Sequence, residues 1–322
     1  MDTEKWNDEN RRETTRSRRF LILALCAALA VAVVLLYFGY TGQLSEFLGI
    51  APTPSPSPTP SLITSDTPGL HAYFLDVGQG DCALLVSPKG KTMLIDAGGS
   101  NAFPTIRDTL DRLGIDRIDV AVLTHLHEDH IGGMAEVITH YPVGELILSP
   151  FDIPSGTYAH ILDAAAENNV PLSSAYAGLY AMIDWDELCE VRILAPYETN
   201  YYDENDTSLI LRVKFGQNAL LFTGDAGEAA ELVALKALPN KLFHADVLKV
   251  GHHGSDTSTG KKFLSTVKPS VAVISVGRDN PYGLPDEAVL SRLEALGTRI
   301  LRTDTDGTVL ITLDGSSATV VE

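Results

Sequence analysis

Residues 124–133 read THLHEDHIGG, and this stretch decides the fold. Four candidate metal ligands fall within six residues: His125, His127, Asp129 and His130. A short apolar strand is predicted at 120–124, so alternation turns the first two imidazoles to one side of an extended loop. The other two ligands precede a predicted helix and can point to a second position. Such ligands bind Zn²⁺, Mn²⁺ and Fe²⁺, and two ions about 3.5–4 Å apart can serve one hydrolysis. A histidine-rich surface loop is the alternative, but the order H-x-H-x-D-H after a strand favours a metal site.

Further motifs indicate a family. LIDAGG (94–99) precedes the histidine loop, and together they resemble the metallo-β-lactamase fold. FLDVGQGDCALL (74–85), LLFTGDAG (220–227) and LKVGHHGS (248–255) resemble the hydrolase domain of ComEC-type competence proteins and their free-standing relatives. The resemblance runs from about His71 to the C-terminus, in the family's motif order. It implies an α/β fold, the αββα sandwich, with the metal site at one edge between the two sheets.

Apolar runs alternating with turns agree with two sheets covered by helices. Strands are predicted at 71–76, 82–87, 93–96, 120–124, 145–148, 191–194, 208–214, 219–223, 245–250, 271–276, 299–303 and 308–313. Helices are predicted at 104–113, 131–141, 158–169, 228–237, 261–267 and 286–296. Residues 150–190 have the weakest pattern and are expected to form a variable insertion over the site.

The resemblance implies that the remaining metal ligands come from distant strand ends. The aspartate that matches Asp225 bridges two ions in the family, and capping of the next helix is the alternative role. The last family ligand matches His252 by its spacing after Gly251. His253 would then face the substrate as a proton donor or oxyanion partner, although the two assignments can be exchanged. Asp129 is expected to be catalytic as well, because it would orient the attacking water.

One family ligand is missing. The wider fold has another histidine between the histidine loop and the bridging aspartate, but here only His140 and His160 lie in that interval, and neither is at a suitable strand start. The matching place is ENDTSLIL (204–211). The first ion would keep His125, His127 and Asp225, with water or Asp206. We therefore expect two divalent ions, Zn²⁺ or Mn²⁺, with a weaker first site or one filled by Mn²⁺.

Residues around the ligands are also predicted. The resemblance implies that Asp96 braces the ligand loop without binding metal. Asp81 is expected nearby with Asp76 and Gln79, on a glycine-rich turn that is otherwise a plain hairpin. Substrate contacts are predicted from Lys249, Ser255, Arg278, Asn280 and Tyr282. The family often has His-Pro where this chain has Leu284-Pro285, so any role of that histidine is lost here.

The N-terminal part differs in composition. Residues 20–40 contain no charge over 21 residues, enough to cross about 30 Å of hydrocarbon. The basic flank before them is expected in the cytoplasm. We predict a basic tail (1–19), a transmembrane helix (20–40), a Pro/Ser/Thr-rich linker (41–69) and a hydrolase domain (70–322) outside the cell membrane. A signal peptide cleaved after Ala30, or a lipoprotein site at Cys26, is a less favoured alternative.

Three cysteines, Cys26, Cys82 and Cys189, indicate neither a disulfide framework nor a thiolate zinc site. Two core thiols are expected at Cys82 and Cys189, with a bridge between them as the alternative.

The predicted function is metal-dependent hydrolysis of a phosphodiester, with nucleic acid as the substrate class implied by the resemblance. The net charge of −18 opposes binding of a polyanion. Basic residues nevertheless concentrate around the His252 loop: Lys249, Lys261, Lys262, Lys268 and Arg278. No small organic cofactor is expected. The alternatives are a hydrolase of a lactam, lactone or thioester, and a non-catalytic partner of a DNA-uptake or envelope complex.

Overall fold

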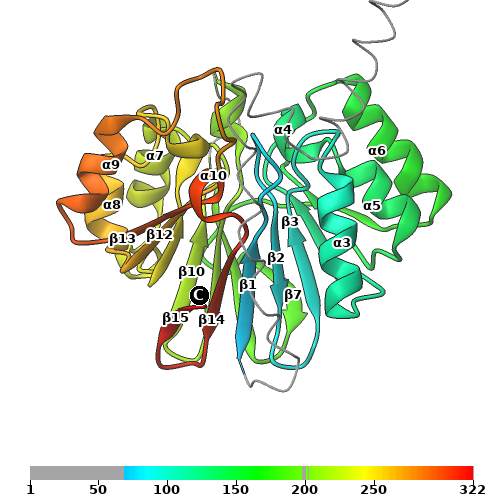
Figure 1. Cartoon of the computed structure of the whole chain (residues 1–322), viewed down its shortest axis with the longest axis horizontal. Coiled ribbons are helices and arrows are strands. Elements are labelled where there is room, and N and C mark those ends of the chain that lie inside the picture. The colour runs from blue at the N-terminus through cyan, green and yellow to red at the C-terminus, as the bar shows by residue number, and fades with distance from the viewer. Residues whose placement is uncertain (1–68, 198–200, 202, 322) are drawn as a thin grey trace, which may run out of the picture. The chain divides into compact units, whose positions relative to one another are not determined.

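The computed structural model describes residues 69–197, 201 and 203–321. They form two β-sheets packed face to face, with helices on both outer surfaces (Figure 1). The predicted αββα sandwich is confirmed. The predicted basic tail and membrane helix, and the linker up to residue 68, lie outside the described residues. Within the described part of the chain, no helix has the length and apolar character needed to cross a membrane.

The first sheet has the strand order β15-β14-β1-β2-β3-β4-β5-β6. These strands are β1 (Leu70–Phe74), β2 (Ala83–Val86), β3 (Thr92–Ile95), β4 (Val120–Leu123), β5 (Leu146–Leu148), β6 (Leu172–Ser174), β14 (Val309–Leu313) and β15 (Ala318–Val321). Pairing is antiparallel from β15 to β3 and parallel from β3 to β6.

The second sheet has the order β13-β12-β11-β10-β9-β8-β7. Its strands are β7 (Met182–Asp186), β8 (Cys189–Ala195), β9 (Ile210–Phe215), β10 (Asn218–Phe222), β11 (Val247–Lys249), β12 (Val271–Ile274) and β13 (Arg299–Arg302). Here β10 to β13 are parallel. Each sheet therefore contains a parallel half, whose strands end at loops able to carry functional side chains.

Helices cover the outer faces of both sheets. Those beside the first sheet are α3 (Phe103–Leu113), α4 (Glu128–Ile131), α5 (Met134–His140) and α6 (Gly156–Glu167). Those beside the second are α7 (Glu228–Ala237), α8 (Lys261–Val267) and α9 (Glu287–Glu294). Short turns of helix are α10 (Thr303–Asp306), η1 (Glu204–Thr207), η2 (Asn240–Leu242) and η3 (Gly251–Gly254).

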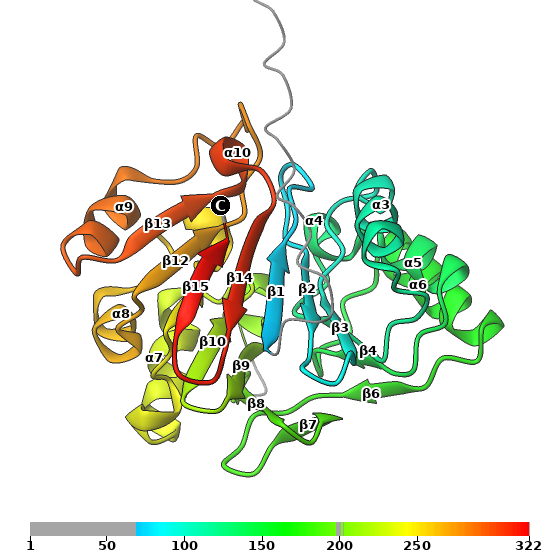
Figure 2. The ribbon, with the colours of Figure 1, turned by 60° about the horizontal axis from the view of Figure 1, so that its bottom comes forward.

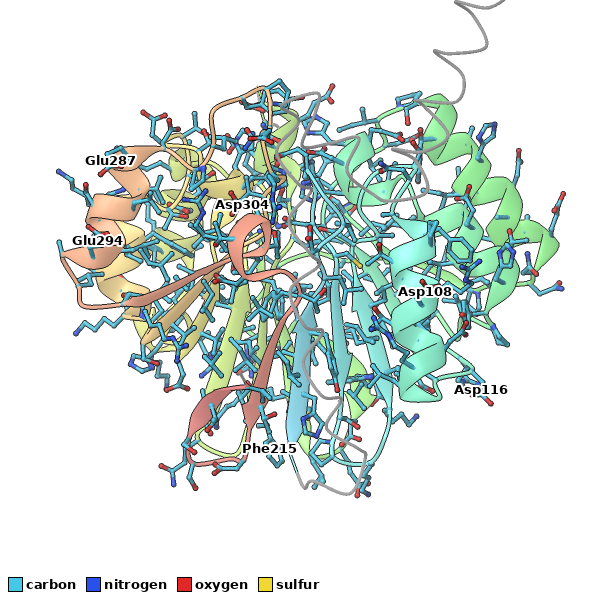
Figure 3. The ribbon with its side chains drawn as sticks, viewed as in Figure 1. Asp108, Asp116, Phe215, Glu287, Glu294 and Asp304 are labelled. Atoms are coloured by element: carbon cyan, nitrogen blue, oxygen red, sulfur yellow. The ribbon has the colours of Figure 1, made fainter. Side chains whose placement is uncertain are left out.

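Alternate side chains of the buried strands enter different cores. In β1, Leu70, Ala72 and Phe74 face the second sheet, whereas Tyr73 packs toward the helices. Phe74 stacks on Phe222 of β10 with ring centroids 5.7 Å apart, which joins the sheets across their interface. Charged side chains such as Asp108, Glu287 and Glu294 lie on the outer helices, away from these cores (Figure 3).

Two predicted features differ from the structure. The helix predicted at 131–141 is interrupted at Gly132 and Gly133, between α4 and α5. A Cβ on Gly132 would lie 2.3 Å from the Ser100 nitrogen and one on Gly133 would lie 2.5 Å from the Ala97 oxygen, so both positions require glycine. The weakly patterned segment 150–190 contains α6 and the edge strands β6 and β7 of the two sheets (Figure 2). Strand β6 is exposed along its length, so it lacks the apolar alternation that marks a strand. The edge strand β15 was also not predicted.

The two described cysteines are buried, unpaired thiols. Cys82 packs among the residues beneath the helices, and Cys189 packs between the sheets. The expectation of two core thiols is confirmed.

Candidate metal centre

The ends of strands from both sheets meet at one cluster of histidines and aspartates. Strand β4 leads into the histidine loop and α4, β10 leads to Asp225, and β11 leads to the turn that carries His252 and His253. The sequence separation between the histidine loop and the last pair exceeds a hundred residues, so the cluster exists only because the sheets pack together.

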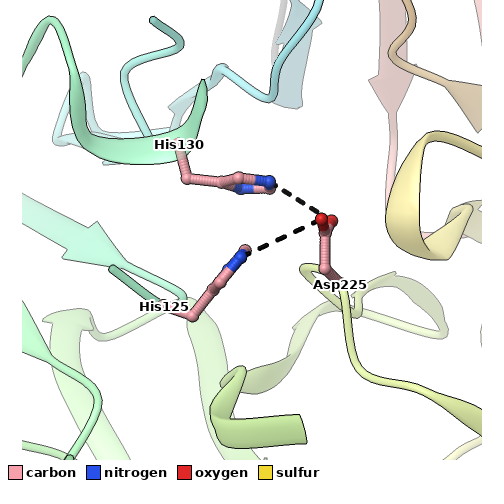
Figure 4. A group of neighbouring side chains, drawn as sticks. All are labelled: His125, His130 and Asp225. Atoms are coloured by element: carbon pink, nitrogen blue, oxygen red, sulfur yellow. Dashed lines mark ion pairs between the residues drawn. The ribbon is translucent and has the colours of Figure 1, made fainter. Parts of the chain in front are cut away.

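One group consists of His125, His130 and Asp225, whose ligand atoms lie within 4.8 Å of one another. Both rings point at the carboxylate of Asp225 (Figure 4). The His130 Nε2 is 3.2 Å from Asp225 Oδ1, and the His125 Nε2 is 3.9 Å from Asp225 Oδ2. All three side chains are buried. His130 Nε2 and Asp225 Oδ1 form a buried ion pair without the geometry of a hydrogen bond, and neither has a hydrogen-bond partner among the described residues. Buried polar atoms without hydrogen bonds are costly, and a cation between these ligands would satisfy both atoms.

A second group shares His130 and adds Asp129 and His253. The His253 Nε2 lies 3.1 Å from Asp129 Oδ2 and 3.6 Å from Asp225 Oδ2. Asp129 is the accessible member of this group, with 35% of its side chain exposed, whereas the His253 side chain is 2% exposed. A substrate or water molecule can therefore reach this cluster from the Asp129 side.

His127 and His252 lie at the solvent-facing side of the cluster. The His127 Nδ1 is 3.0 Å from His125 Nε2, and its Nε2 is 3.1 Å from the Glu204 carboxylate. The His252 Nε2 is 3.8 Å from Asp225 Oδ2, and its Nδ1 is 2.9 Å from the Thr257 hydroxyl. Sequence reasoning missed both partners, because neither belongs to the motif of the histidine it contacts.

The two rings of the histidine pair differ in burial. His253, predicted to face the substrate, is the buried neighbour of Asp129 and His130, and His252, predicted as the last ligand, is more exposed. The reason is that both residues adopt positive φ, 49° and 52°, so the chain turns left-handed after Gly251 and sends the second ring inward.

Asp96 supports the histidine loop through three contacts. Its carboxylate accepts hydrogen bonds from the Thr124 nitrogen and the Thr124 hydroxyl, both at 2.8 Å. Its Oδ2 also lies 2.9 Å from His130 Nδ1. The ring of His130 is thereby held with Nε2 toward Asp225, as outer carboxylates orient ligand imidazoles in metal sites.

Asp81 occupies a comparable place behind His253. Its Oδ1 is 3.2 Å from His253 Nδ1, and its Oδ2 is 2.7 Å from the Lys249 ammonium group. Lys249 is 3% exposed and also donates to the Val250 carbonyl. The prediction that Lys249 contacts substrate is therefore wrong, because its ammonium group is buried and paired with Asp81.

Electrostatic effects in the cluster come from burial and from the carboxylates. Burial disfavours the charged form of His253, but Asp225, Asp129 and Asp81 outweigh it and raise the pKa of this ring to about 10. The pKa of His130 is likewise well above its ordinary value, because Asp225 and Asp96 outweigh the effect of burial. For His125, burial prevails and lowers the pKa well below the usual range. The carboxylates therefore attract positive charge to the position between the histidines.

The other predicted substrate residues lie on loops at this edge. The Asn280 side chain makes its hydrogen bonds within its own loop. It donates to the carbonyls of Gly277 and Leu284 and accepts from the nitrogens of Tyr282 and Leu284. The Arg278 guanidinium donates to the Asp304 carbonyl, and Tyr282 is 70% exposed. Ser255 contacts the Thr257 hydroxyl at 3.0 Å.

The glycine-rich turn links that loop to the cluster. The Gln79 side chain accepts from the Gly277 nitrogen, and the Asp81 nitrogen donates to the Asp129 carbonyl. The Asp76 carboxylate accepts a hydrogen bond from the Gly78 nitrogen within the turn.

The segment 204–211 carries no imidazole and supports Asp225 instead. The buried Ser208 hydroxyl accepts from the Asp225 nitrogen at 3.1 Å. Asp206, considered as a ligand, accepts from the Gly227 nitrogen at the start of α7. His140 packs on Phe103 and, like His160, is exposed on an outer helix.

Comparison with known proteins identifies the family. The model of the metallo-beta-lactamase superfamily matches residues 75–278. The chain belongs to this superfamily. It is 31% identical over 252 residues to ComE operon protein 3 of Bacillus subtilis (strain 168), a match that covers 73% of this chain and 32% of that protein. It is 32% identical over 288 residues to the competence protein ComA of Neisseria gonorrhoeae, covering 89% and 38% of the two chains. The chain thus spans about a third of the length of these relatives.

A solved structure agrees in fold. Igni18, a metallo hydrolase from the archaeon Ignicoccus hospitalis, superposes with a TM-score of 0.51 at 17% identity, covering 74% of this chain and 98% of that one. With the family match and the clusters of histidine and aspartate, the chain is a metal-dependent hydrolase of the metallo-beta-lactamase superfamily.

Proposed function

We propose that this chain is a phosphodiesterase that acts on nucleic acid, using two divalent ions. The observation that carries the proposal is the similarity to two proteins named for competence, ComE operon protein 3 and ComA. In this chain, the histidine loop, Asp225 and the histidine pair also lie together. The resemblance of its motifs to ComEC-type hydrolase domains implies the same substrate class.

The residues present fit a pair of ions. Asp129, His130, His253 and Asp225 would hold one ion, and His125, His127 and Asp225 would contribute to the other. Bound divalent ions of this kind activate water near neutral pH and neutralise charge on a phosphoryl group. Asp225 lies between the two sets, because its Oδ1 is near His130 and its Oδ2 is near both His125 and His253. Asp129, whose side chain is 35% exposed, would orient the attacking water.

Positive charge for the substrate phosphate would come from the rim of the site. Lys261 and Lys262 are exposed at the start of α8, the helix that follows the histidine turn after a six-residue loop. Arg278 is exposed on the loop that Gln79 holds beside the glycine-rich turn. These cations, together with bound metal, would offset the acidic body of the protein locally.

The N-terminal segment would place this activity outside the membrane. Residues 20–40 are uncharged and the preceding segment is basic. We infer a single-pass anchor with a cytoplasmic N-terminus and an extracytoplasmic hydrolase domain.

The test measures hydrolysis by the full chain supplied with Mn²⁺ or Zn²⁺. Single-stranded DNA, a chromogenic phosphodiester and a chromogenic β-lactam are offered in parallel. We expect cleavage of both phosphodiesters and none of the lactam. Asp129→Ala should lower turnover by more than the roughly 100-fold that loss of an outer partner causes, whereas Asp163→Ala, on the exposed side of α6, should leave it unchanged.

Two results would overturn the proposal. Turnover of the lactam alone would support a small-substrate hydrolase. A metal-loaded protein that cleaves none of the three would support a non-catalytic partner.

A further inference from the structure

The first ion position is short of one ligand. Its two imidazoles come from the histidine loop, and the family's third imidazole would come from segment 204–211, where Ser208 is buried beneath Asp225 instead. Between the histidine loop and Asp225, the described residues include two histidines, His140 and His160, and both lie on outer helices. A further nitrogen donor for this position must come from another element.

The turn after β11 supplies two imidazoles. His252 and His253 both have positive φ, and their ring centroids are 6.2 Å apart. Their Nε2 atoms nevertheless lie 3.8 and 3.6 Å from the same atom, Oδ2 of Asp225. The two rings thus approach one carboxylate oxygen from separate directions. Two successive left-handed residues other than glycine strain the backbone, and proteins retain such strain mainly at functional sites.

Each ring is held by its other nitrogen. The His253 Nδ1 donates to the Ser275 carbonyl at 2.9 Å, and because a carbonyl only accepts, Nε2 is the atom left to bind. The His252 Nδ1 lies 2.9 Å from the Thr257 hydroxyl, which leaves its Nε2 directed at Asp225. Imidazoles that bind metal are held in this way by a partner at the second nitrogen.

We propose that the two histidines serve different ions. His252 Nε2 completes the position formed by His125, His127 and Asp225, and His253 Nε2 completes the position formed by Asp129, His130 and Asp225. This assignment rests on the pair of ions in the proposed function. It gives each ion four protein ligands, so the first position is not the weaker one that the missing family histidine suggested.

Distances between the first-position atoms agree with this assignment. Two atoms bound tetrahedrally at about 2.1 Å from one ion lie roughly 3.4 Å apart. The separations found are 3.0 Å between His125 Nε2 and His127 Nδ1, 3.9 Å between His125 Nε2 and Asp225 Oδ2, and 3.8 Å between His252 Nε2 and Asp225 Oδ2. His125 and His252 thus approach the same carboxylate oxygen and His127 approaches His125, so the four atoms form one connected set.

The experiment measures manganese bound to the full chain, by elemental analysis and by electron paramagnetic resonance, which distinguishes a coupled pair of ions from an isolated ion. His252→Asn keeps a residue that tolerates positive φ and removes the imidazole. We expect the wild type to bind two coupled ions and His252→Asn to bind one isolated ion. His252→Asp, which retains a ligand, should recover much of the second ion. His244→Asn, at an exposed position before β11, is the matched control and should keep both.

Double variants identify which ion is lost. His127→Asn with His252→Asn removes two ligands of one position, so one ion should remain. His127→Asn with His253→Asn damages both positions, so neither ion should bind tightly. Thermal melting confirms that each variant is folded. Two coupled ions retained in His252→Asn, a single ion in the wild type, or equal losses in the two double variants would each overturn the assignment. These readings use no substrate, so a failed phosphodiesterase assay is a separate result.

Discussion

The ammonium group of Lys249 lies 2.7 Å from Asp81 Oδ2, and both side chains are almost completely buried. Desolvation opposes the ionised carboxylate, but Lys249 and then His253 outweigh it and hold the pKa of Asp81 well below its ordinary value. A buried pair of this kind is costly to break, because removal of one partner leaves the other charge uncompensated.

Lys249→Met should therefore destabilise the protein by about 3–5 kcal/mol, measured by chemical denaturation. Lys261→Met, at an exposed position of α8, should change stability by less than about 0.5 kcal/mol. Adding Asp81→Asn to Lys249→Met should recover part of the loss, because it removes the unpaired charge. No recovery in the double variant would count against the pair as the origin of the effect.

A Cβ at Gly80 should displace the histidine loop. Gly80 has φ of 140°, and a Cβ there would lie 2.2 Å from the Asp129 carbonyl. Gly80→Ala should therefore cost on the order of 1–3 kcal/mol and weaken metal binding, measured by denaturation and by metal titration. Gly156→Ala is the control, since no atom lies within 4 Å of its added Cβ. Equal metal affinity in both variants would contradict this coupling.

Removal of metal should loosen the packing of the two sheets, because the histidine loop belongs to one sheet, and Asp225 and the histidine pair belong to the other. A ligand present at 100 times its Kd stabilises the native state by about 2.7 kcal/mol. Chelation should lower the melting temperature measured by calorimetry, and added Mn²⁺ should restore it. In Asp225→Asn the chelator should have little effect. A wild-type melting temperature that ignores the chelator would argue against ions joining the sheets.

The stability of the protein should fall as pH rises from about 5 to 8, through Glu231. Burial raises the pKa of this carboxyl to about 8, although it accepts hydrogen bonds from the Thr259 and Gly260 nitrogens. Between the unfolded and folded pKa values the folded state binds more protons, so the free energy of unfolding decreases with pH. Denaturation across this range should show the decrease, reduced in Glu231→Gln and retained in Glu294→Gln, at an exposed position of α9. A slope unaffected by Glu231→Gln would exclude this residue as its source.

The sequence predicted those features that a local pattern encodes. Short continuous apolar runs located strands such as β4 and β10, and the ligand spacing in the histidine loop located the centre. Contacts between residues far apart in the chain could not be predicted from the sequence. The sequence around Lys249 does not distinguish a lysine exposed to solvent from one paired with Asp81 inside the fold. Likewise, nothing in the sequence near Glu204 indicates that it contacts His127. The pair His252-His253 carries no signal of left-handed backbone, so the direction of each ring could not be deduced.

That left-handed pair limits how the chain can diverge. Few residue types occur at positive φ with appreciable frequency, chiefly glycine, asparagine, aspartate and histidine. Of these, histidine and aspartate are also good donors to a transition metal. Related sequences that keep this turn should therefore replace histidine at 252 or 253 by aspartate more readily than by an aliphatic residue. A β-branched residue at either position would indicate that both the left-handed turn and metal binding have been lost.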